Sequence, residues 1–380
     1  MRRITFFSHS PDLYGAERSL LLLLEGMDRE RYEPLLVIPC EGMMEDQAAM
    51  LDIPVRRLSR EGIGPHRPLL GRAAYFPRIR ALLKAESPDL VYINTAAHTA
   101  PLFAAKSLSL PTIVHVRESE GYFSYRTLLG RARIAGLVRF PDHFIAVSAA
   151  TAEMLRWSGA FQNKISVVYN GVDIGSYRPD DESRLAARRL LGLGENELLV
   201  GFLGQLIPRK GGDIFLQAAR LVHERHPECR FLMVGGPLGS EHHRSLVALS
   251  RELGLERLLT FLDFQNDVRP YYGAMDLFVN CSRREPFARV NLEAMAMATP
   301  VVATDVGGNR EAVADGECGY VVEPEQPVLL AEKIGDLLAR PELRKAFGKA
   351  ARARVSERFS LEHYRAGVNA VIDGLLREKH

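Results

Sequence analysis

Two glutamates eight positions apart, Glu285 and Glu293, flank the expected start of a helix. A helix beginning near Ala288 or Arg289 leaves backbone N–H groups without helical partners, and these groups together with the helix dipole favour phosphate. Carboxylates accept hydrogen bonds from sugar hydroxyls, so two of them beside a phosphate site indicate a nucleotide-sugar ligand. The alternative is a capped surface helix with two solvated glutamates, because acidic residues near helix starts are common.

The residues that follow give this segment its structural setting. Residues 290–298 are rich in good helix formers, and residues 301–304 form a short β-branched run suited to a parallel strand. Pro300 opens that strand and the pair Gly307-Gly308 closes it. The order loop, helix, strand and glycine turn is what an α/β fold uses to hold an anionic nucleotide.

The whole segment resembles the signature of the retaining family 4 glycosyltransferases. That signature reads Glu-Pro-Phe-Gly, a second Glu eight positions after the first, then Ala-Met-Ala-x-Gly-x-Pro-Val-Val-Ala-x-x-x-Gly-Gly. The chain departs from it at Ala288 and at Ala298-Thr299, where the family usually has glycine. Alanine at 288 fits only a backbone with negative φ.

The resemblance implies roles for the residues of the segment. Glu285 contacts donor-sugar hydroxyls and acts in catalysis, whereas Glu293 binds the ribose hydroxyls. The other expected donor-binding residues of this segment are Phe287, Ala288, Arg289, Val290, Asn291, Gly307 and Gly308.

A second stretch, residues 204–211, matches the family pattern Gly-Arg-Leu, three variable residues, then Lys-Gly. By resemblance, Lys210 is the catalytic lysine that binds the donor diphosphate. Gln205 replaces the usual arginine and brings no charge, while Arg209 next to the lysine offers a guanidinium in its place. Both are expected donor-binding residues; the alternative for the lysine is a solvated side chain on a loop.

The N-terminal half offers two further candidates. Gly15 opens a helix in the loop after the first strand, where the family approaches the donor phosphates; an ordinary turn is the alternative. His115 ends the expected strand 112–116, and the resemblance implies that it lines the donor-sugar pocket as a third catalytic residue. A buried structural histidine is the alternative. Phe264 stands where a base could stack, although a core phenylalanine fits that position as well.

Strand and helix signals alternate along the chain, which predicts parallel, doubly wound sheets. The expected strands are 4–8, 35–39, 90–93, 112–116, 143–147 and 165–169 in one series, and 198–203, 231–234, 259–262, 277–280 and 301–304 in another. We expect an N-terminal Rossmann-like acceptor-binding domain at 1–170, a linker at 171–195 and a donor-binding domain at 196–359. The resemblance implies the GT-B architecture, in which the two domains face a central cleft and helix 360–380 packs back on the first.

Composition excludes several classes. A net charge of +2 argues against a nucleic-acid binder, and four cysteines without metal or redox spacing suit a reduced, cytoplasmic protein. The N-terminal residues have too short an apolar run for a signal peptide, and no Asp-x-Asp motif marks a metal site, so we expect neither cofactor nor metal. No Gly-x-Gly-x-x-Gly follows the first strand of either series, which disfavours a dinucleotide oxidoreductase.

Basic residues gather between positions 56 and 139, with 14 Lys and Arg against 5 Asp and Glu. Such a surface suits an anionic membrane or a lipid-linked acceptor, and a solvated basic face is the equal alternative.

The resemblance thus implies a retaining, metal-independent transferase that moves a sugar from a UDP- or GDP-sugar to a saccharide or lipid-linked acceptor, in polysaccharide or glycolipid biosynthesis, on the cytoplasmic side of the membrane. A decayed transferase that binds nucleotide sugars and a GT-B epimerase are the two other hypotheses.

Overall fold

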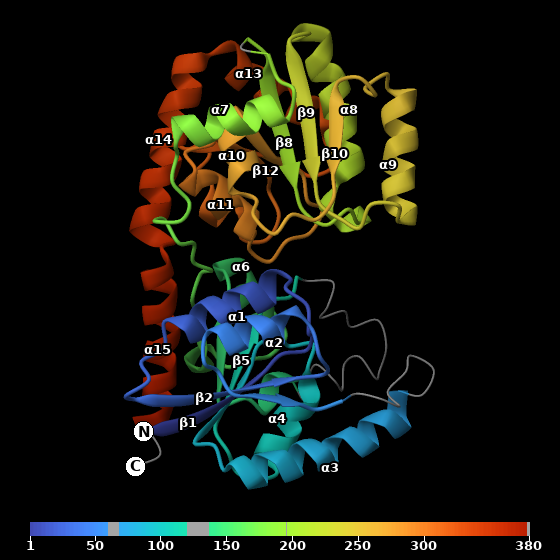
Figure 1. The fold of residues 1–380 in the computed structure, drawn as a ribbon. Coiled ribbons are helices and arrows are strands. Elements are labelled where there is room, and N and C mark those ends of the chain that lie inside the picture. Colours follow the sequence, from blue (N-terminus) through green and yellow to red (C-terminus); the bar gives the residue numbers. More distant parts are fainter. Residues whose placement is uncertain (60–67, 120–136, 195, 378–380) are drawn as a thin grey trace. The chain divides into compact units, whose positions relative to one another are not determined.

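The computed structural model describes residues 1–59, 68–119, 137–194 and 196–377, without the side chains of 68–74. The chain divides into two compact units (Figure 1). The first comprises Met1–Gly171 and Leu361–His380, and the second comprises Val172–Ser360.

The first unit is built on a parallel sheet of seven strands in the order β3-β2-β1-β4-β5-β6-β7. Its strands are β1 (Arg2–Phe7), β2 (Tyr32–Ile38), β3 (Val55–Arg57), β4 (Leu90–Ile93), β5 (Thr112–Val116), β6 (His143–Ala146) and β7 (Ile165–Val167). Its helices are α1 (Gly15–Glu25), α2 (Met43–Met50), α3 (Pro68–Glu86), α4 (Thr99–Lys106), α6 (Ala149–Trp157) and α15 (Leu361–Arg377), with the 3₁₀ turn η2 (Gln162–Lys164). Although α15 comes last in the chain, its Tyr364, Val368 and Ile372 lie in the core beneath β1 and β2.

The second unit has a parallel sheet of six strands in the order β10-β9-β8-β11-β12-β13. These are β8 (Leu198–Leu203), β9 (Cys229–Val234), β10 (Leu259–Leu262), β11 (Leu277–Asn280), β12 (Val301–Thr304) and β13 (Gly319–Val322). The helices are α7 (Asp181–Leu190), α8 (Gly212–Arg225), α9 (Glu241–Glu252), α10 (Arg269–Ala274), α11 (Arg289–Ala296), α12 (Asn309–Ala312), α13 (Pro327–Ala339) and α14 (Pro341–Arg358), with the 3₁₀ turn η3 (Pro208–Lys210).

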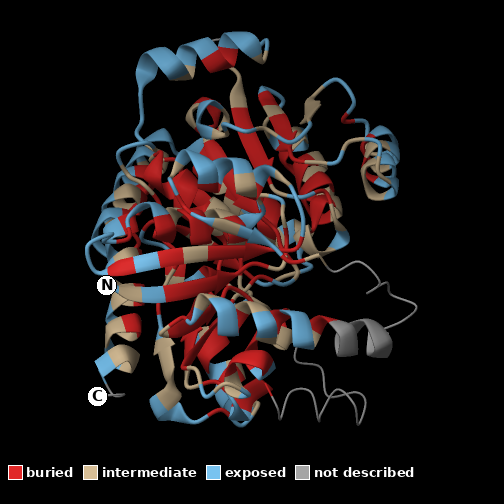
Figure 2. Cartoon of the chain, turned by 60° about the horizontal axis from the view of Figure 1, so that its bottom comes forward, coloured by how far each residue is buried: buried red, intermediate tan, exposed pale blue. Residues whose placement is uncertain are grey.

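Helices cover both faces of each sheet (Figure 1). The central strands are apolar without alternation because the side chains on both of their faces are buried. Figure 2 shows buried residues running along the strands and exposed residues on the outer sides of the helices. All five residues of β5 and all four of β11 are buried. The fold class predicted from the alternation, two doubly wound Rossmann-like units, is confirmed.

Two edge strands, β3 and β13, were not predicted from the sequence. Strand β3 is three residues long, Val-Arg-Arg, and two of these residues are exposed. Strand β13 is four residues long and begins with a glycine. Strand β3 lacks the apolar run of the buried strands, whereas β13 has a run of only three apolar residues, Tyr-Val-Val, after its glycine.

Strand order reverses once in each sheet. In the first unit, β1 pairs with β2 on one side and β4 on the other; in the second, β8 pairs with β9 and β11. Loops that leave neighbouring strands at such a switch point diverge, and the crevice between them is where open α/β sheets bind ligands. The two switch points therefore define where the candidate site residues should be sought.

Candidate functional site

Lys210 and Glu285 meet at the switch point of the second unit. Lys210 follows β8 and Glu285 follows β11, and the Lys210 ammonium donates a hydrogen bond to Glu285 Oε2. Ser282 Oγ lies 3.3 Å from the same oxygen and Arg209 Nη1 lies 3.7 Å from it. The Lys210 and Glu285 side chains are only 14% and 10% exposed. The structure thus places two predicted catalytic residues in one partly buried cluster.

Glycines hold the loops of this cluster against one another. Gly307 has φ +52°, and a Cβ atom there would lie 1.7 Å from the carbonyl oxygen of Glu285. Gly308 donates its backbone N–H to the carbonyl of Pro286 at 3.0 Å. Gly211 has φ +73°, and its Cβ would lie 2.1 Å from the carbonyl oxygen of Cys281. Only glycine permits the approaches at 211 and 307, and Gly307 together with the backbone bond of Gly308 fixes the loop that carries Glu285.

Helix α11 begins immediately after this loop. Ala288 is its N-cap with φ −76° and ψ 111°, an extended conformation that alanine adopts without strain. The alanine has no side-chain oxygen to cap the helix, and its first turn presents backbone N–H groups next to this loop. The N–H of Asn291 donates to the carbonyl of Ala288 at 3.2 Å, which closes the first turn of the helix. This geometry suits a phosphate group.

Glu293 lies one turn into α11 and is held by two neighbours. Tyr272 donates its hydroxyl to Glu293 Oε2 at 3.1 Å, and Arg289 Nη2 lies 3.4 Å from Oε1. Burial, together with the Glu293 carboxylate, raises the pKa of Tyr272 well above its ordinary value, so it stays a donor. The sequence pattern identified Glu293 and Arg289 but not Tyr272, which comes from α10.

Two predicted donor-binding residues have structural side chains. Asn291 accepts from Asn280 at 2.9 Å and donates to Asn309 at 3.0 Å, which joins β11, α11 and α12 in a buried amide chain. Phe287 is 2% exposed and packs on Phe359, with ring centroids 5.6 Å apart. A donor contact by either residue would therefore involve the backbone. Gln205 is exposed after β8, and Phe264 after β10 is 50% exposed, so neither is a core side chain.

In the first unit, Gly15 is exposed at the start of α1, but His115 is not at a surface. Its ring is 0% exposed, and Nδ1 accepts hydrogen bonds from the Tyr92 hydroxyl and from Arg117 Nη2. The guanidinium can only donate, so the proton of the neutral ring is on Nε2. Burial, and then the charge of Arg117, lowers the pKa of His115 well below its ordinary value. In the structure His115 is a buried neutral side chain that accepts from Arg117, and its place in a sugar pocket stays a prediction.

Arg117 itself lies at the carboxyl end of β5 and joins several segments. Its Nε donates to Asn94 Oδ1 at 3.1 Å, its Nη1 to Asn170 Oδ1 at 2.7 Å and its Nη2 to the Tyr364 hydroxyl at 2.9 Å. These partners are neutral groups from β4, the segment after β7 and α15. A half-buried positive charge is thereby fixed at the edge of the sheet where ligands bind.

Part of the basic excess between 56 and 139 is neutralised. Arg56 pairs with Glu86 at 2.8 Å, and Arg57 pairs with Glu45 at 2.8 Å and Glu41 at 3.1 Å. Within this stretch, residues 60–67 and 120–136 lie outside the described residues.

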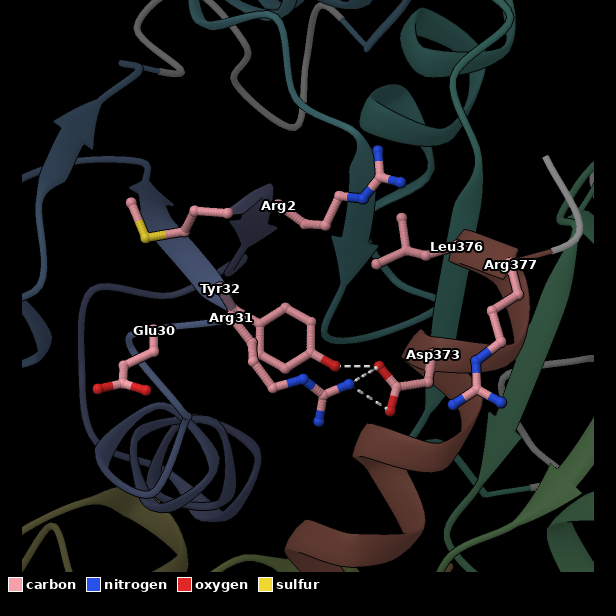
Figure 3. A pocket seen from close by; sticks show the side chains of 8 residues that line it. Arg2, Glu30, Arg31, Tyr32, Asp373, Leu376 and Arg377 are labelled. Atoms are coloured by element: carbon pink, nitrogen blue, oxygen red, sulfur yellow. Dashed lines mark hydrogen bonds and ion pairs between the residues drawn. The ribbon is translucent and has the colours of Figure 1, made fainter. Parts of the chain in front are cut away.

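A surface pocket of about 410 Å³ lies elsewhere in the first unit. It is lined by Met1, Arg2, Glu30, Arg31, Tyr32, Asp373, Leu376 and Arg377. Figure 3 shows Asp373 of α15 receiving Arg31 and the Tyr32 hydroxyl from β2 and the residue before it. Arg2 and Tyr32 are the first residues of their strands, so this pocket is at the amino edge of the sheet, away from the switch point.

No group of three His, Cys, Asp or Glu side chains in the described ranges is placed to hold a metal ion. None of the helices in those ranges is long and apolar enough to cross a membrane.

Two doubly wound units with polar loops at their switch points are the architecture of the GT-B class of proteins. Residues 183–354 match the family described as "Glycosyl transferases group 1", and residues 14–176 match "Glycosyltransferase Family 4". The chain therefore belongs to the family 4 glycosyltransferases, as the sequence signature predicted.

Characterised relatives agree with this membership. A D-inositol 3-phosphate glycosyltransferase of Nocardia farcinica is 37% identical over 246 residues, 63% of this chain and 54% of that protein. The corresponding protein of Rhodococcus jostii is 40% identical over 234 residues, covering 60% and 51%. The chain thus spans about half the length of the curated relatives it matches.

Solved structures share the fold across the chain. Anabaena Alr3699/HepE in complex with UDP and glucose has a TM-score of 0.86 and 26% identity, covering 98% of this chain and 100% of that one. Sucrose-phosphate synthase from Thermosynechococcus elongatus has a TM-score of 0.84 at 20% identity with 100% of both chains covered, a likeness of fold.

Proposed function

We propose that this chain is a glycosyltransferase that moves a sugar from a nucleotide-diphosphate sugar to a saccharide or lipid-linked acceptor. The observation that carries the proposal is the partly buried Lys210–Glu285 cluster at the switch point of the second unit, beside the start of α11. The similarity to a structure solved with UDP and UDP-glucose favours a UDP-sugar as donor.

The proposed chemistry follows from charge. Breaking the bond between the sugar and the diphosphate builds negative charge on the leaving oxygen and positive character on the sugar. Lys210, Arg209 and the first-turn N–H groups of α11 stabilise the leaving diphosphate, each charged hydrogen bond contributing about 1.5–3 kcal/mol. Metal is not needed in this scheme, because side chains and backbone dipoles carry the positive potential.

Donor binding would change the partner of Lys210 in this ion pair. Without ligand, the Lys210 ammonium is compensated by Glu285. When a diphosphate takes over the lysine, the Glu285 carboxylate becomes available to hydrogen-bond the sugar hydroxyls. Glu293, already oriented by Tyr272, binds the ribose hydroxyls. The transfer then proceeds with retention of anomeric configuration, the leaving phosphate accepting the acceptor's proton.

The setting we propose is polysaccharide or glycolipid assembly at the cytoplasmic face of a membrane, with peripheral contact to anionic lipid. The basic excess between residues 56 and 139 supports it, reduced by the pairs of Arg56 and Arg57 with glutamates. In a flotation assay with vesicles of about 30–40% phosphatidylglycerol, the protein should float with the vesicles at low salt and dissociate from them as the salt concentration rises. Absence from the vesicle fraction at low salt would remove the membrane from the proposal.

The decisive experiment for the function is turnover with a panel of donors and acceptors. UDP-, GDP- and ADP-sugars are incubated with inositol phosphate, oligosaccharides and lipid-linked saccharides, and nucleotide release and the anomeric configuration of the product are measured. Product formation with one nucleotide family, abolished in Lys210→Met, supports the proposal. Nucleotide binding without turnover would indicate the decayed transferase, and conversion of the donor sugar into its epimer would indicate the epimerase.

A further inference from the structure

Arg283 lies on the loop after β11, two positions before Glu285, and joins this loop to the turn that carries Lys210. Its backbone N–H donates to the carbonyl of Arg209 at 2.9 Å, and its Nη1 donates to the carbonyl of Pro208 at 2.7 Å. Both carbonyls belong to the turn η3, whose last residue is Lys210. One residue therefore binds two successive peptide groups of the short turn that ends in the lysine.

Two carboxylates hold the guanidinium of Arg283 in this position. Its Nη1 and Nη2 donate to the two oxygens of Asp213 at 2.8 and 2.6 Å, and Asp213 lies in the first turn of α8. Its Nε donates to Glu325 Oε1, and its Nη2 lies 3.3 Å from Glu325 Oε2. Glu325 follows β13 and has φ +60°, a conformation that few residues other than glycine adopt. The guanidinium thus joins the loops after β8, β11 and β13 to the start of α8.

These contacts occupy the guanidinium completely. A guanidinium has five N–H donors, and that of Arg283 makes two contacts with Asp213, two with Glu325 and one with Pro208. Its side chain is 28% exposed, and two carboxylates offset its charge. Arg209 differs, because its side chain is 40% exposed and its Nη1 lies 3.7 Å from a carboxylate oxygen. Arg283 is therefore placed to hold loops together, whereas Arg209 is placed to meet a phosphate.

We propose that Arg283 is a positioning residue, which fixes the Lys210 ammonium where the donor diphosphate binds. A lysine ammonium stands at the end of a flexible four-carbon stem, so the point that it reaches depends on the backbone that carries the stem. Loss of the arginine side chain frees the carbonyl of Pro208 from its side-chain donor and leaves the two carboxylates without their shared cation. The inference rests on the proposed function and adds to it a residue that acts through the lysine.

The test is titration calorimetry of the full chain with UDP and with UMP. UMP lacks the phosphate that is joined to the sugar in the donor, which is where the leaving charge develops. Arg283→Ala should raise the Kd of UDP about tenfold, the factor expected when one charged hydrogen bond is weakened, and should keep the Kd of UMP within about twofold of wild type. An equal rise for both nucleotides would indicate general damage to the unit and would overturn the inference.

A second variant of the lysine shows whether the arginine acts through it. Lys210→Met by itself should weaken UDP binding, and Arg283→Ala added to it should raise the Kd no further. Losses that add in the double variant would overturn the inference.

Arg283→Lys keeps the charge and most of the volume but not the planar fork, so it tests the geometry even where the alanine variant does not fold. It should lose UDP affinity as Arg283→Ala does. A wild-type Kd for UDP in Arg283→Lys would overturn the inference.

The matched control is Arg251→Ala in the same unit. Arg251 pairs with Glu256, with side chains 66% and 59% exposed, and its removal should leave both Kd values at those of wild type. An unchanged Kd for UDP in a folded Arg283→Ala protein would overturn the inference, while UDP binding by wild type leaves the proposed function standing. A wild type that binds no UDP would overturn the proposed UDP-sugar donor and the inference with it.

Discussion

Replacing Lys210 should expose how much the second unit depends on its partly buried ion pair. Lys210→Met keeps the length of the side chain but removes the ammonium that Glu285 Oε2 accepts from. Breaking a buried pair by removing one partner costs about 3–5 kcal/mol, because the remaining charge is left uncompensated. Glu285 retains Ser282 at 3.3 Å and Arg209 at 3.7 Å, so we expect the lower end, about 3 kcal/mol.

A double-mutant cycle isolates the pair. Glu285→Gln should cost about 2 kcal/mol, and the double variant less than the sum of the single variants, with a coupling energy of about 2 kcal/mol. Lys345→Met is the matched control, since Lys345 pairs with Glu342 on α14 with side chains 74% and 87% exposed. An exposed pair contributes at most about 1 kcal/mol, so this control should change stability little.

The assay is urea unfolding of the full chain with two signals. Trp157, the single tryptophan, lies in the first unit, so its fluorescence reports that unit, whereas far-UV circular dichroism reports both. The loss in Lys210→Met should appear in the dichroism transition and leave the tryptophan transition unchanged. A stability equal to wild type, or additive single variants without coupling, would refute the buried pair.

Three further changes test other parts of the second unit. Ala298, at a glycine position of the family signature, has φ +55°; Ala298→Gly should relieve about 1–2 kcal/mol of strain, offset by about 0.5–1 kcal/mol of glycine entropy, and a slightly higher melting temperature in calorimetry would bear this out. Gly307→Ala should lower the melting temperature and weaken UDP binding in titration calorimetry, because its Cβ would lie 1.7 Å from the Glu285 carbonyl oxygen; unchanged binding would contradict the glycine contact. Burial opposes ionisation of Asp213, but the Arg283 guanidinium holds the pKa of this carboxyl below its ordinary value, so the carboxylate stabilises the fold above its unfolded pKa and this contribution is lost as pH falls through the lower folded pKa. Asp213→Asn should therefore make the free energy of unfolding less dependent on pH between about pH 5 and 2. The same loss of stability with acid in the variant as in wild type, measured by pH-dependent unfolding, would count against this.

Most of the fold could be predicted from the sequence, because most of its strands are uninterrupted apolar runs separated by segments with helical periodicity. The residue types of the candidate site could also be predicted from the sequence, since Glu285, Glu293 and Lys210 stand in fixed spacing to glycines and a helix start. Spacing alone did not predict that Lys210 and Glu285 pair with each other, because they follow different strands, 75 positions apart. That contact exists only through the order of β8 and β11 in the sheet.

The orientation of side chains on the sheet of the first unit could not be predicted from the sequence for a different reason. All of β5 is buried, so no alternation of apolar and polar residues shows which way His115 points. The partners that enclose Arg117 come from positions 53 and 247 residues away, Asn170 and Tyr364. Contacts of that separation depend on the return of α15 to the first unit, which local pattern does not encode.

The most direct test of the account is a crystal structure of the full chain with UDP. The account predicts the diphosphate against the Lys210 ammonium and the first-turn N–H groups of α11, with Glu285 released from the lysine. A diphosphate bound instead in the pocket lined by Arg2, Arg31 and Arg377 at the amino edge of the first sheet, with the Lys210–Glu285 pair intact, would contradict it.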